Sequence, residues 1–305
     1  MKVKVFIDGS AGTTGLRIRE RLESREELEL LSLPAEKRKD LKAREEIINA
    51  ADVAFFCLPD AASIEAASLV HGDTLIIDTS TAHRTLDDWA YGFPELFGLR
   101  EKILHSHRIG NPGCHASGFI SLVEPLVHEG LVSPETALSC FSVTGYSGGG
   151  KSMIADYEAE YRPAALSSPR QYALGQAHKH LKEMKKICGL ESEPVFCPIV
   201  ADYYSGMAVT VPLFKKDLRG SVEDIRALYK DRYHSAIVHY DESDDAMVAG
   251  NELSGRDDMK IRVAGNEDRI LLISVFDNLG KGASGAAIQN MNILLGLDET
   301  TGLVV

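Results

Sequence analysis

A glycine-rich turn near the start of the chain constrains the fold more than any other feature. An apolar run over residues 3–7 leads into Asp8-Gly-Ser-Ala-Gly-Thr-Thr-Gly15, and a helical pattern over residues 16–22 follows. Glycine lets the backbone turn tightly and approach a pyrophosphate, and the helix start offers N–H groups to the anion. The pattern is a variant of the dinucleotide-binding fingerprint, with an ordinary strand–helix turn as the alternative. It predicts cofactor contacts from Gly9, Ser10, Ala11, Gly12, Thr13, Thr14 and Gly15.

The next segments repeat the alternation of strand and helix. Apolar runs over residues 28–33, 51–58 and 74–78 predict buried strands, and residues 64–70 predict a helix. This order is typical of a doubly wound parallel sheet, so we expect an N-terminal Rossmann domain over residues 1–111. Ser80 and Thr81 follow the carboxyl end of a strand, where ligands of such sheets bind, and are predicted cofactor contacts. Simple capping residues are the alternative.

Charges after the second strand indicate which nicotinamide cofactor is used. Sites specific for NAD place an acidic residue near the end of this strand. Here the strand ends at Leu33-Pro34-Ala35, and the basic cluster Lys37, Arg38 and Lys39 follows. Such a cluster suits the 2′-phosphate of NADP(H) better than a bare ribose. A solvated charged loop is the alternative.

The second half of the chain has a different pattern. Residues 138–144, 208–213, 260–264 and 269–276 predict half-exposed strands, and residues 153–161 and 221–233 predict helices. We expect an α+β catalytic and oligomerisation domain over residues 112–277, with a mixed or antiparallel sheet. A helix over residues 286–295, within the segment 278–305, is expected to return to the first domain and complete it.

Composition excludes several classes of protein. The chain has 305 residues, enough for two domains, and a net charge of −12 without a basic stripe, which argues against a nucleic-acid partner. No apolar run approaches membrane-spanning length, and no signal peptide precedes the first strand. The five cysteines are widely spaced, which indicates neither a disulfide framework nor a metal cluster. We expect a cytoplasmic protein without a structural metal.

Cys114 stands at the entry to a predicted helix. Asn111-Pro112-Gly113 is a turn sequence, and the apolar stretch 116–123 behind His115 has helical character. Unpaired N–H groups and the helix dipole at such a start favour the reactive thiolate. We therefore interpret Cys114 as a nucleophile, with an inert buried cysteine as the alternative. His115 adjoins it but is expected to point elsewhere.

A second glycine-rich motif competes with this interpretation. Gly145-Tyr-Ser-Gly-Gly-Gly-Lys-Ser152 matches the phosphate loop of P-loop NTPases, follows an apolar strand and precedes a predicted helix. Such a protein needs a parallel sheet downstream, with an acidic residue at a strand end. The downstream strands alternate like antiparallel ones instead. A P-loop ATPase is therefore the less favoured alternative, and the glycines are expected to line a wall of the active site.

Taken together, the motifs resemble the short form of the N-acetyl-γ-glutamyl-phosphate reductases, within the aspartate-semialdehyde dehydrogenase-like superfamily. The resemblance covers essentially the whole chain. It rests on the segments 9–15, 78–84, 91–96, 111–114, 145–151, 178–184 and 280–292. The cysteine motif alone also fits aspartate-semialdehyde dehydrogenases, whereas the tail motif and the His-x-His-x-x-Glu segment are more specific.

The resemblance implies an activity as well as a fold. It implies an NADP-binding Rossmann domain joined to a domain like that of glyceraldehyde-3-phosphate dehydrogenase, in a homotetramer. The implied oxidoreductase reaction belongs to arginine biosynthesis and converts N-acetyl-L-glutamyl 5-phosphate to the semialdehyde through a thioester on Cys114. His180 is implied as the acid–base residue, with His178 as the alternative and Glu183 one helical turn further on. The resemblance also places Asn278, Gly280 and Lys281 near the nicotinamide.

The acyl-phosphate substrate would carry phosphate and carboxylate charges, so cationic side chains are expected beside it. Arg84 is the predicted clamp because a guanidinium binds such groups bidentately, with a surface salt bridge as the alternative. Lys151 is a weaker candidate, and Asn111 is assigned to the same substrate site. Two further alternatives stay open: an aspartate-semialdehyde dehydrogenase, and a non-catalytic NADP-binding regulator with an unreactive Cys114.

Overall fold

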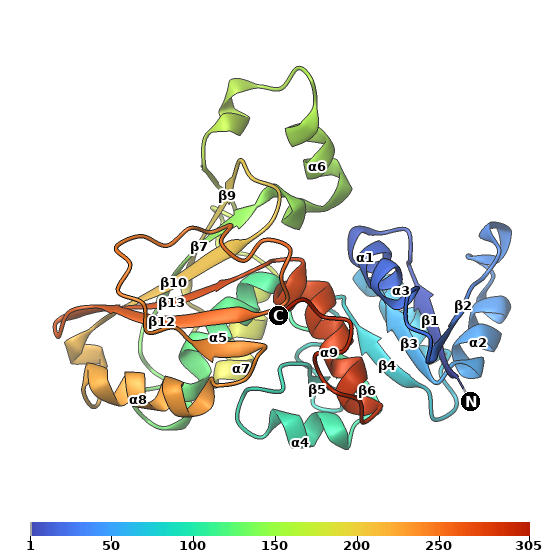
Figure 1. Ribbon diagram of the computed structural model, residues 1–305, viewed down its shortest axis with the longest axis horizontal. Helices are drawn as coiled ribbons and strands as arrows, with labels where there is room; N and C mark the ends of the chain where they lie inside the picture. The colour runs from blue at the N-terminus through green and yellow to red at the C-terminus, as the bar shows by residue number, and fades with distance from the viewer. Residues whose placement is uncertain (1) are drawn as a thin grey trace. The chain divides into compact units, whose positions relative to one another are not determined.

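The computed structural model describes residues 2–305, whose contacts divide into two compact units (Figure 1). Unit 1 contains the chain up to Pro94, Gly98–Pro112 and Ala283–Leu303. Unit 2 contains Glu95–Phe97, Gly113–Gly282 and Val304–Val305. Residues 278–282, assigned to the first domain by sequence, therefore fall in unit 2. No helix of the described residues has the length and apolarity needed to cross a bilayer.

Unit 1 is built on a six-stranded sheet in the order β2-β1-β3-β4-β6-β5, in which every pair of neighbours is parallel. The predicted doubly wound parallel sheet is confirmed. Its strands are β1 Val3–Asp8, β2 Leu28–Leu31, β3 Val53–Phe56, β4 Leu75–Asp78, β5 Ala90–Tyr91 and β6 Arg108–Gly110. Its helices are α1 Thr13–Leu22, the 3₁₀ turn η1 Ala35–Lys37, α2 Leu41–Ala50, α3 Asp60–Ser68, α4 Leu99–Leu104 and α9 Gly285–Leu294.

Successive side chains of β1 point to opposite faces of this sheet, and helices cover both faces. Val5 and Ile7 pack into one core with Ile18 of α1 and Ile288 of α9. Phe6 points the opposite way, into a second core with the α2 and α3 side chains. Because both faces are covered, the strands are almost continuously apolar, and all four residues of β3 are buried.

Unit 2 is built on a seven-stranded mixed sheet in the order β11-β12-β13-β10-β7-β9-β8. The strands are β7 Ser139–Gly145, β8 Arg170–Gln171, β9 Val195–Ala201, β10 Met207–Phe214, β11 Val238–Tyr240, β12 Met259–Gly265 and β13 Arg269–Phe276. Its helices and turns are α5 Cys114–His128, η2 Tyr146–Gly149, α6 Gly150–Glu158, η3 Ala164–Ser167, α7 His180–Cys188, η4 Lys215–Asp217 and α8 Val222–Arg232. The turn η5 Gly280–Ser284 contains residues of both units. The predicted α+β domain with a mixed sheet is confirmed, and α6 stands away from this sheet in Figure 1.

Helix α5 is buried between the sheet and its neighbouring helices. Residues 115–126 are all buried, which explains the apolar composition around the whole helix. At Gly118 the helix touches the sheet, because a Cβ there would lie 2.4 Å from Cγ2 of Val209. This close packing fixes the position of the helix start at Cys114.

The Gly145–Ser152 motif forms the end of β7, the turn η2 and the start of α6. However, β7 lies between antiparallel β10 and parallel β9, and β13 runs antiparallel to β10. A phosphate loop of an NTPase instead opens from a parallel sheet. The P-loop ATPase interpretation is therefore wrong for this fold.

A three-residue segment, Glu95–Phe97, belongs to unit 2 although the chain on either side of it belongs to unit 1. Arg232 of α8 donates from Nε to the carbonyl oxygen of Glu95 at 2.7 Å, and its guanidinium carbon lies 3.8 Å from the centre of the Phe97 ring. The His128 imidazole stacks on the same ring. These contacts anchor the segment to α5 and α8.

Candidate active site

Cys114 is the first residue of α5, and the extended backbone of Gly113 precedes it as the N-cap. Because the N-cap residue is a glycine, it offers no side chain of its own to the N–H groups of this helix start. Cys114 lines a cavity of about 150 Å³ within unit 2. The other chemically active side chains that line this cavity are His115, Tyr172, His178, Lys179 and His180.

Glu183 holds the backbone directly before the cysteine. Its buried carboxylate accepts a hydrogen bond from the N–H of Gly113, with 2.8 Å between oxygen and nitrogen. His180 begins the same helix, α7, one turn earlier and is also buried. The His-x-x-Glu spacing thus brings an imidazole to the cavity and ties α7 to the start of α5.

His178 and His180 form an ordered pair. The backbone N–H of His180 donates to Nδ1 of His178 at 3.2 Å, and the two ring centres lie 4.7 Å apart. Burial, with the charge of Lys179, lowers the pKa of His178 to about 4. His178 is therefore neutral near pH 7, and because Nδ1 accepts a hydrogen bond, its proton lies on Nε2.

The expectation that His115 points away from Cys114 is wrong. Its ring lines the same cavity as Cys114 and lies between two hydroxyl groups. The Nδ1 atom is 2.6 Å from Oγ of Ser142, and Nε2 is 2.6 Å from the hydroxyl of Tyr172. Burial, with the neighbouring His178, lowers the pKa of His115 to about 3. Sequence reasoning missed Ser142 and Tyr172, because no local pattern links them to Cys114.

The glycine-rich turn forms a second cavity, of about 240 Å³, within unit 1. Gly9, Ser10 and Ala11 line it, and Gly12 to Gly15 form the N-cap and first turn of α1. Gly9 has a φ of +88°, and a Cβ at Gly15 would lie 2.5 Å from the Gly9 carbonyl oxygen. Side chains at these positions would clash with the backbone, so the tight turn before α1 depends on glycine, as in the dinucleotide-binding fingerprint.

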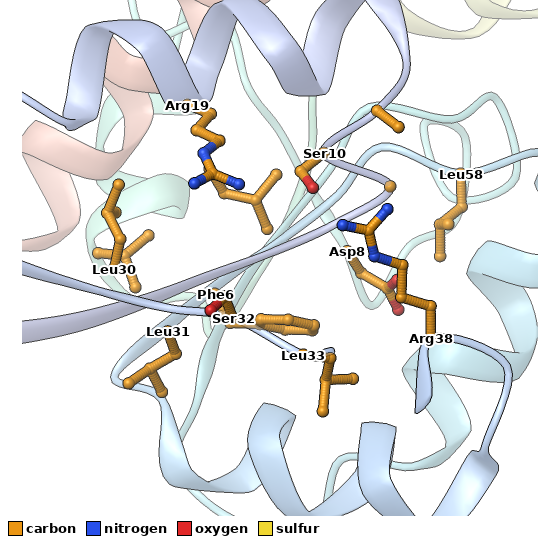
Figure 2. Close-up of a pocket in the computed structure, with 14 residues that line it drawn as sticks. Phe6, Asp8, Ser10, Arg19, Leu30, Leu31, Ser32, Leu33, Arg38 and Leu58 are labelled. Carbon is orange, nitrogen blue, oxygen red and sulfur yellow. The ribbon is translucent and has the colours of Figure 1, made fainter. Parts of the chain in front are cut away.

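Two arginines line the cavity at the glycine turn. Figure 2 shows Arg19 of α1 and Arg38, which follows η1, reaching toward it, with Ser10 between them in this view. Of the basic cluster at residues 37–39, Arg38 alone lines the cavity. Sequence reasoning missed Arg19, which also pairs with the exposed Glu23.

Ser80 and Thr81 both bond to acidic side chains within unit 1. Ser80 donates from Oγ to Asp78 at 2.6 Å, and Thr81 donates from Oγ1 to Asp60 at 2.5 Å. The Thr81 bond ties the loop after β4 to the start of α3, and the Ser80 bond holds the loop to the end of β4, so both hydroxyls have a structural role. Contact with a cofactor stays a prediction for both residues.

Arg84 and Asn111 are the two predicted substrate-site residues that lie in unit 1, and they are hydrogen-bonded to each other. Arg84 is buried and donates from Nε to the Asn111 carbonyl oxygen at 2.7 Å and from Nη2 to the Thr79 carbonyl oxygen at 2.9 Å. Asn111 donates from Nδ2 to the Ala283 carbonyl oxygen at 3.0 Å. Arg84 therefore fixes the turn before Cys114, and its role as an anion clamp stays a prediction. Lys151 is exposed on α6 in unit 2.

Asn278, Gly280 and Lys281 lie in unit 2 and pack closely there. Asn278 accepts from the Gly206 N–H at 2.8 Å and donates to Oγ of Ser147 at 3.0 Å. The buried ammonium of Lys281 pairs with both carboxylate oxygens of Glu95, at 2.8 and 2.9 Å. A Cβ at Gly280 would lie 2.0 Å from the Arg256 carbonyl oxygen. Their predicted contact with nicotinamide is untested.

Two family descriptions match the chain. Residues 4–105 match "Semialdehyde dehydrogenase, NAD binding domain", and residues 114–278 match "Semialdehyde dehydrogenase, dimerisation domain". The second match begins at Cys114.

Among solved structures, an aspartate semialdehyde dehydrogenase II of Vibrio cholerae complexed with ASA superimposes with a TM-score of 0.72 at 17% identity, covering 97% of this chain and 99% of that one. An aspartate semialdehyde dehydrogenase of Candida albicans with NADP gives 0.67 at 18% identity, with the same coverage. At such identities the likeness shows a shared fold.

Curated relatives are closer in sequence. Proteins from Brucella ovis and Brucella canis, both named N-acetyl-gamma-glutamyl-phosphate reductase, are 45% identical to this chain over 309 residues. The matches cover 97% of this chain and 100% of each relative. The chain therefore belongs to the N-acetyl-γ-glutamyl-phosphate reductase family of the semialdehyde dehydrogenases.

Proposed function

We propose that the protein reduces N-acetyl-L-glutamyl 5-phosphate to N-acetyl-L-glutamate 5-semialdehyde with NADPH, a step of arginine biosynthesis in the cytoplasm. The names of full-length relatives at 45% identity support this substrate. The observation that carries the chemistry is Cys114 as the first residue of a helix, in a cavity lined by three histidines.

Covalent catalysis suits this site. The Cys114 sulfur attacks the acyl carbon, the bond from that carbon to the phosphate oxygen breaks, and phosphate leaves a thioester behind. When bound, the nicotinamide cofactor supplies a hydride for reduction at the thioester carbon. Cys114 then departs as a thiolate while the aldehyde forms. His180 is the proposed acid–base residue, because its imidazole lies at the cavity wall beside the nucleophile.

The glycine turn at residues 9–15 supports binding of the pyrophosphate of such a cofactor, because Gly9 and Gly15 allow a tight turn into the start of α1 where an added Cβ would clash with the backbone. Arg38, at the edge of the adjoining cavity, is the proposed contact for the 2′-phosphate and thus the basis for NADPH use. An exposed apolar strip on the sheet of unit 2 supports association into the proposed homotetramer. Its exposed members are Phe141, Val195 and Leu271, from β7, β9 and β13.

The test is NADPH oxidation with N-acetylglutamyl phosphate and, separately, with aspartyl phosphate. We expect turnover of the first substrate only, and loss of activity by at least about 10³-fold in Cys114→Ser. Turnover of aspartyl phosphate alone would instead assign the chain to the chemistry of its structural neighbours. An iodoacetamide reaction that fails to label Cys114 would favour a non-catalytic regulator.

A further inference from the structure

Three side chains from separate parts of unit 2 form a continuous hydrogen-bonded row. Ser142 of β7 contacts Nδ1 of His115, and Nε2 of His115 contacts the hydroxyl of Tyr172, each at 2.6 Å. Ser142 is fully buried, whereas Tyr172 lines the cavity that holds Cys114. The row therefore runs from the core to the site of the nucleophile.

Proton counting fixes the direction of these hydrogen bonds. Within residues 2–305, His115 Nδ1 is the single hydrogen-bond partner of the buried Ser142 hydroxyl. Leaving that proton unpaired would cost the desolvation free energy of a buried hydroxyl, so Ser142 donates and Nδ1 accepts. Neutral His115 then carries its proton on Nε2 and donates it to the Tyr172 oxygen. The Tyr172 O–H is left to point into the cavity.

The surroundings maintain this arrangement. The low pKa of His115, about 3, keeps its ring neutral, so only one nitrogen donates. Burial and the nearby Cys114 raise the pKa of Tyr172, so its hydroxyl stays protonated.

The backbone turn after Tyr172 is held in an unusual conformation. Ala173, directly after Tyr172, and Gln176 have φ values of +52° and +51°, which cost free energy in non-glycine residues. Two hydrogen bonds between the Gln176 amide and the Phe196 backbone, at 2.7 and 2.8 Å, hold that turn.

We propose that Tyr172 is a further catalytic residue, and that Ser142 and His115 are positioning residues that aim its hydroxyl. The Tyr172 O–H donates a hydrogen bond to the substrate oxygen that becomes negative when Cys114 attacks the acyl carbon. No proton is transferred; the hydroxyl stabilises the developing charge, as an oxyanion-hole donor does. This role rests on the proposed acyl-transfer function.

Tyr172→Phe tests the donor directly. We expect kcat to fall about 100-fold with little change in KM, as for loss of one oxyanion donor. Alkylation of Cys114 by iodoacetamide should keep its rate, because the nucleophile is untouched. Unchanged kcat would overturn the proposal. A lost alkylation rate would also overturn it, since the effect would then be structural.

The hydrogen-bond direction has a test that requires no substrate. In ¹³C/¹⁵N-labelled protein, NMR shifts of the His115 ring should report the neutral tautomer with the proton on Nε2. Ser142→Ala should abolish the preference for this tautomer and lower kcat severalfold. The matched control is Ser117→Ala, which removes another buried hydroxyl of unit 2, on α5, and should change neither. A proton on Nδ1 of His115 in the wild-type protein would overturn the proposed direction of the hydrogen bonds, whichever substrate the enzyme reduces.

Discussion

The carboxylate of Glu183 accepts the N–H of Gly113 at 2.8 Å, and so α7 fixes the residue that caps the helix of Cys114. The same helix begins with His180. One hydrogen bond thereby couples the position of the proposed nucleophile to that of the proposed acid–base residue.

Glu183→Ala should destabilise the protein and misplace Cys114. It leaves the Gly113 N–H without its acceptor, which costs about 1–3 kcal/mol of unfolding free energy. Glu183→Gln keeps an acceptor oxygen and should restore most of that stability. Urea unfolding of both variants measures the difference, and equal stability of the two would show that the hydrogen bond contributes nothing.

Gly282→Ala should impair catalysis more than stability. An added Cβ would lie 2.9 Å from the Cys114 Cβ and 3.1 Å from the Asp277 carbonyl oxygen, so the cysteine has to move. Small displacements of a reacting group are costly, and we expect kcat to fall about tenfold or more. Gly72→Ala is the matched control, since nothing lies within 4 Å of its Cβ position. Full activity of Gly282→Ala would show that the contact is tolerated.

Arg38→Ala should weaken selection for NADPH. If Arg38 binds the 2′-phosphate, KM for NADPH rises about tenfold or more while KM for NADH changes little. Lys39→Ala is the control, because Lys39 is exposed and does not line the cavity. Steady-state kinetics with both cofactors decide the matter. A parallel loss with NADPH and NADH would place Arg38 elsewhere on the nucleotide.

Stability should fall in acid partly because of His178. Its pKa drops from 6.5 to about 4 on folding, so between these values the unfolded chain binds a proton that the folded protein does not. This contribution is complete above pH 6.5 and is lost as the pH falls toward 4. Glu124, whose pKa burial raises to about 7, acts with the opposite sign.

The His178→Gln variant isolates this effect. The decrease in Tm between pH 7 and pH 5 should be smaller in His178→Gln than in the wild-type protein. His105→Gln, at an exposed side chain, should keep the wild-type slope. An unaltered slope in His178→Gln would mean that His178 titrates normally in the folded state.

Local patterns were enough to predict much of the fold. The glycine turn and the apolar strands of unit 1 follow from residues near one another in sequence. The predicted helix over residues 64–70 instead begins at Asp60, directly after Pro59, and ends at Ser68. Strand β9 was missed because Pro198 interrupts its pattern, and β8, two residues long, has no period to detect.

Some residues of the site could likewise be predicted from local patterns, and others could not. Cys114 and His180 were found from short motifs, whereas the row from Ser142 to Tyr172 depends on contacts across 27 and 57 residues of chain. Only the folded sheet brings those side chains together. Likewise, the sequence drew attention to the basic cluster at residues 37–39, but gave no reason to single out Arg38 from it or to place Arg19 at the same cavity.

The Glu95–Phe97 tripeptide has a consequence for dissecting the protein. A fragment beginning at Gly113 would lack the carboxylate that pairs with buried Lys281 and the ring on which Arg232 and His128 rest. Cleavage at a single peptide bond thus cannot release unit 2 intact. Any attempt to exchange one unit between relatives therefore has to carry these three residues along with the rest of unit 2.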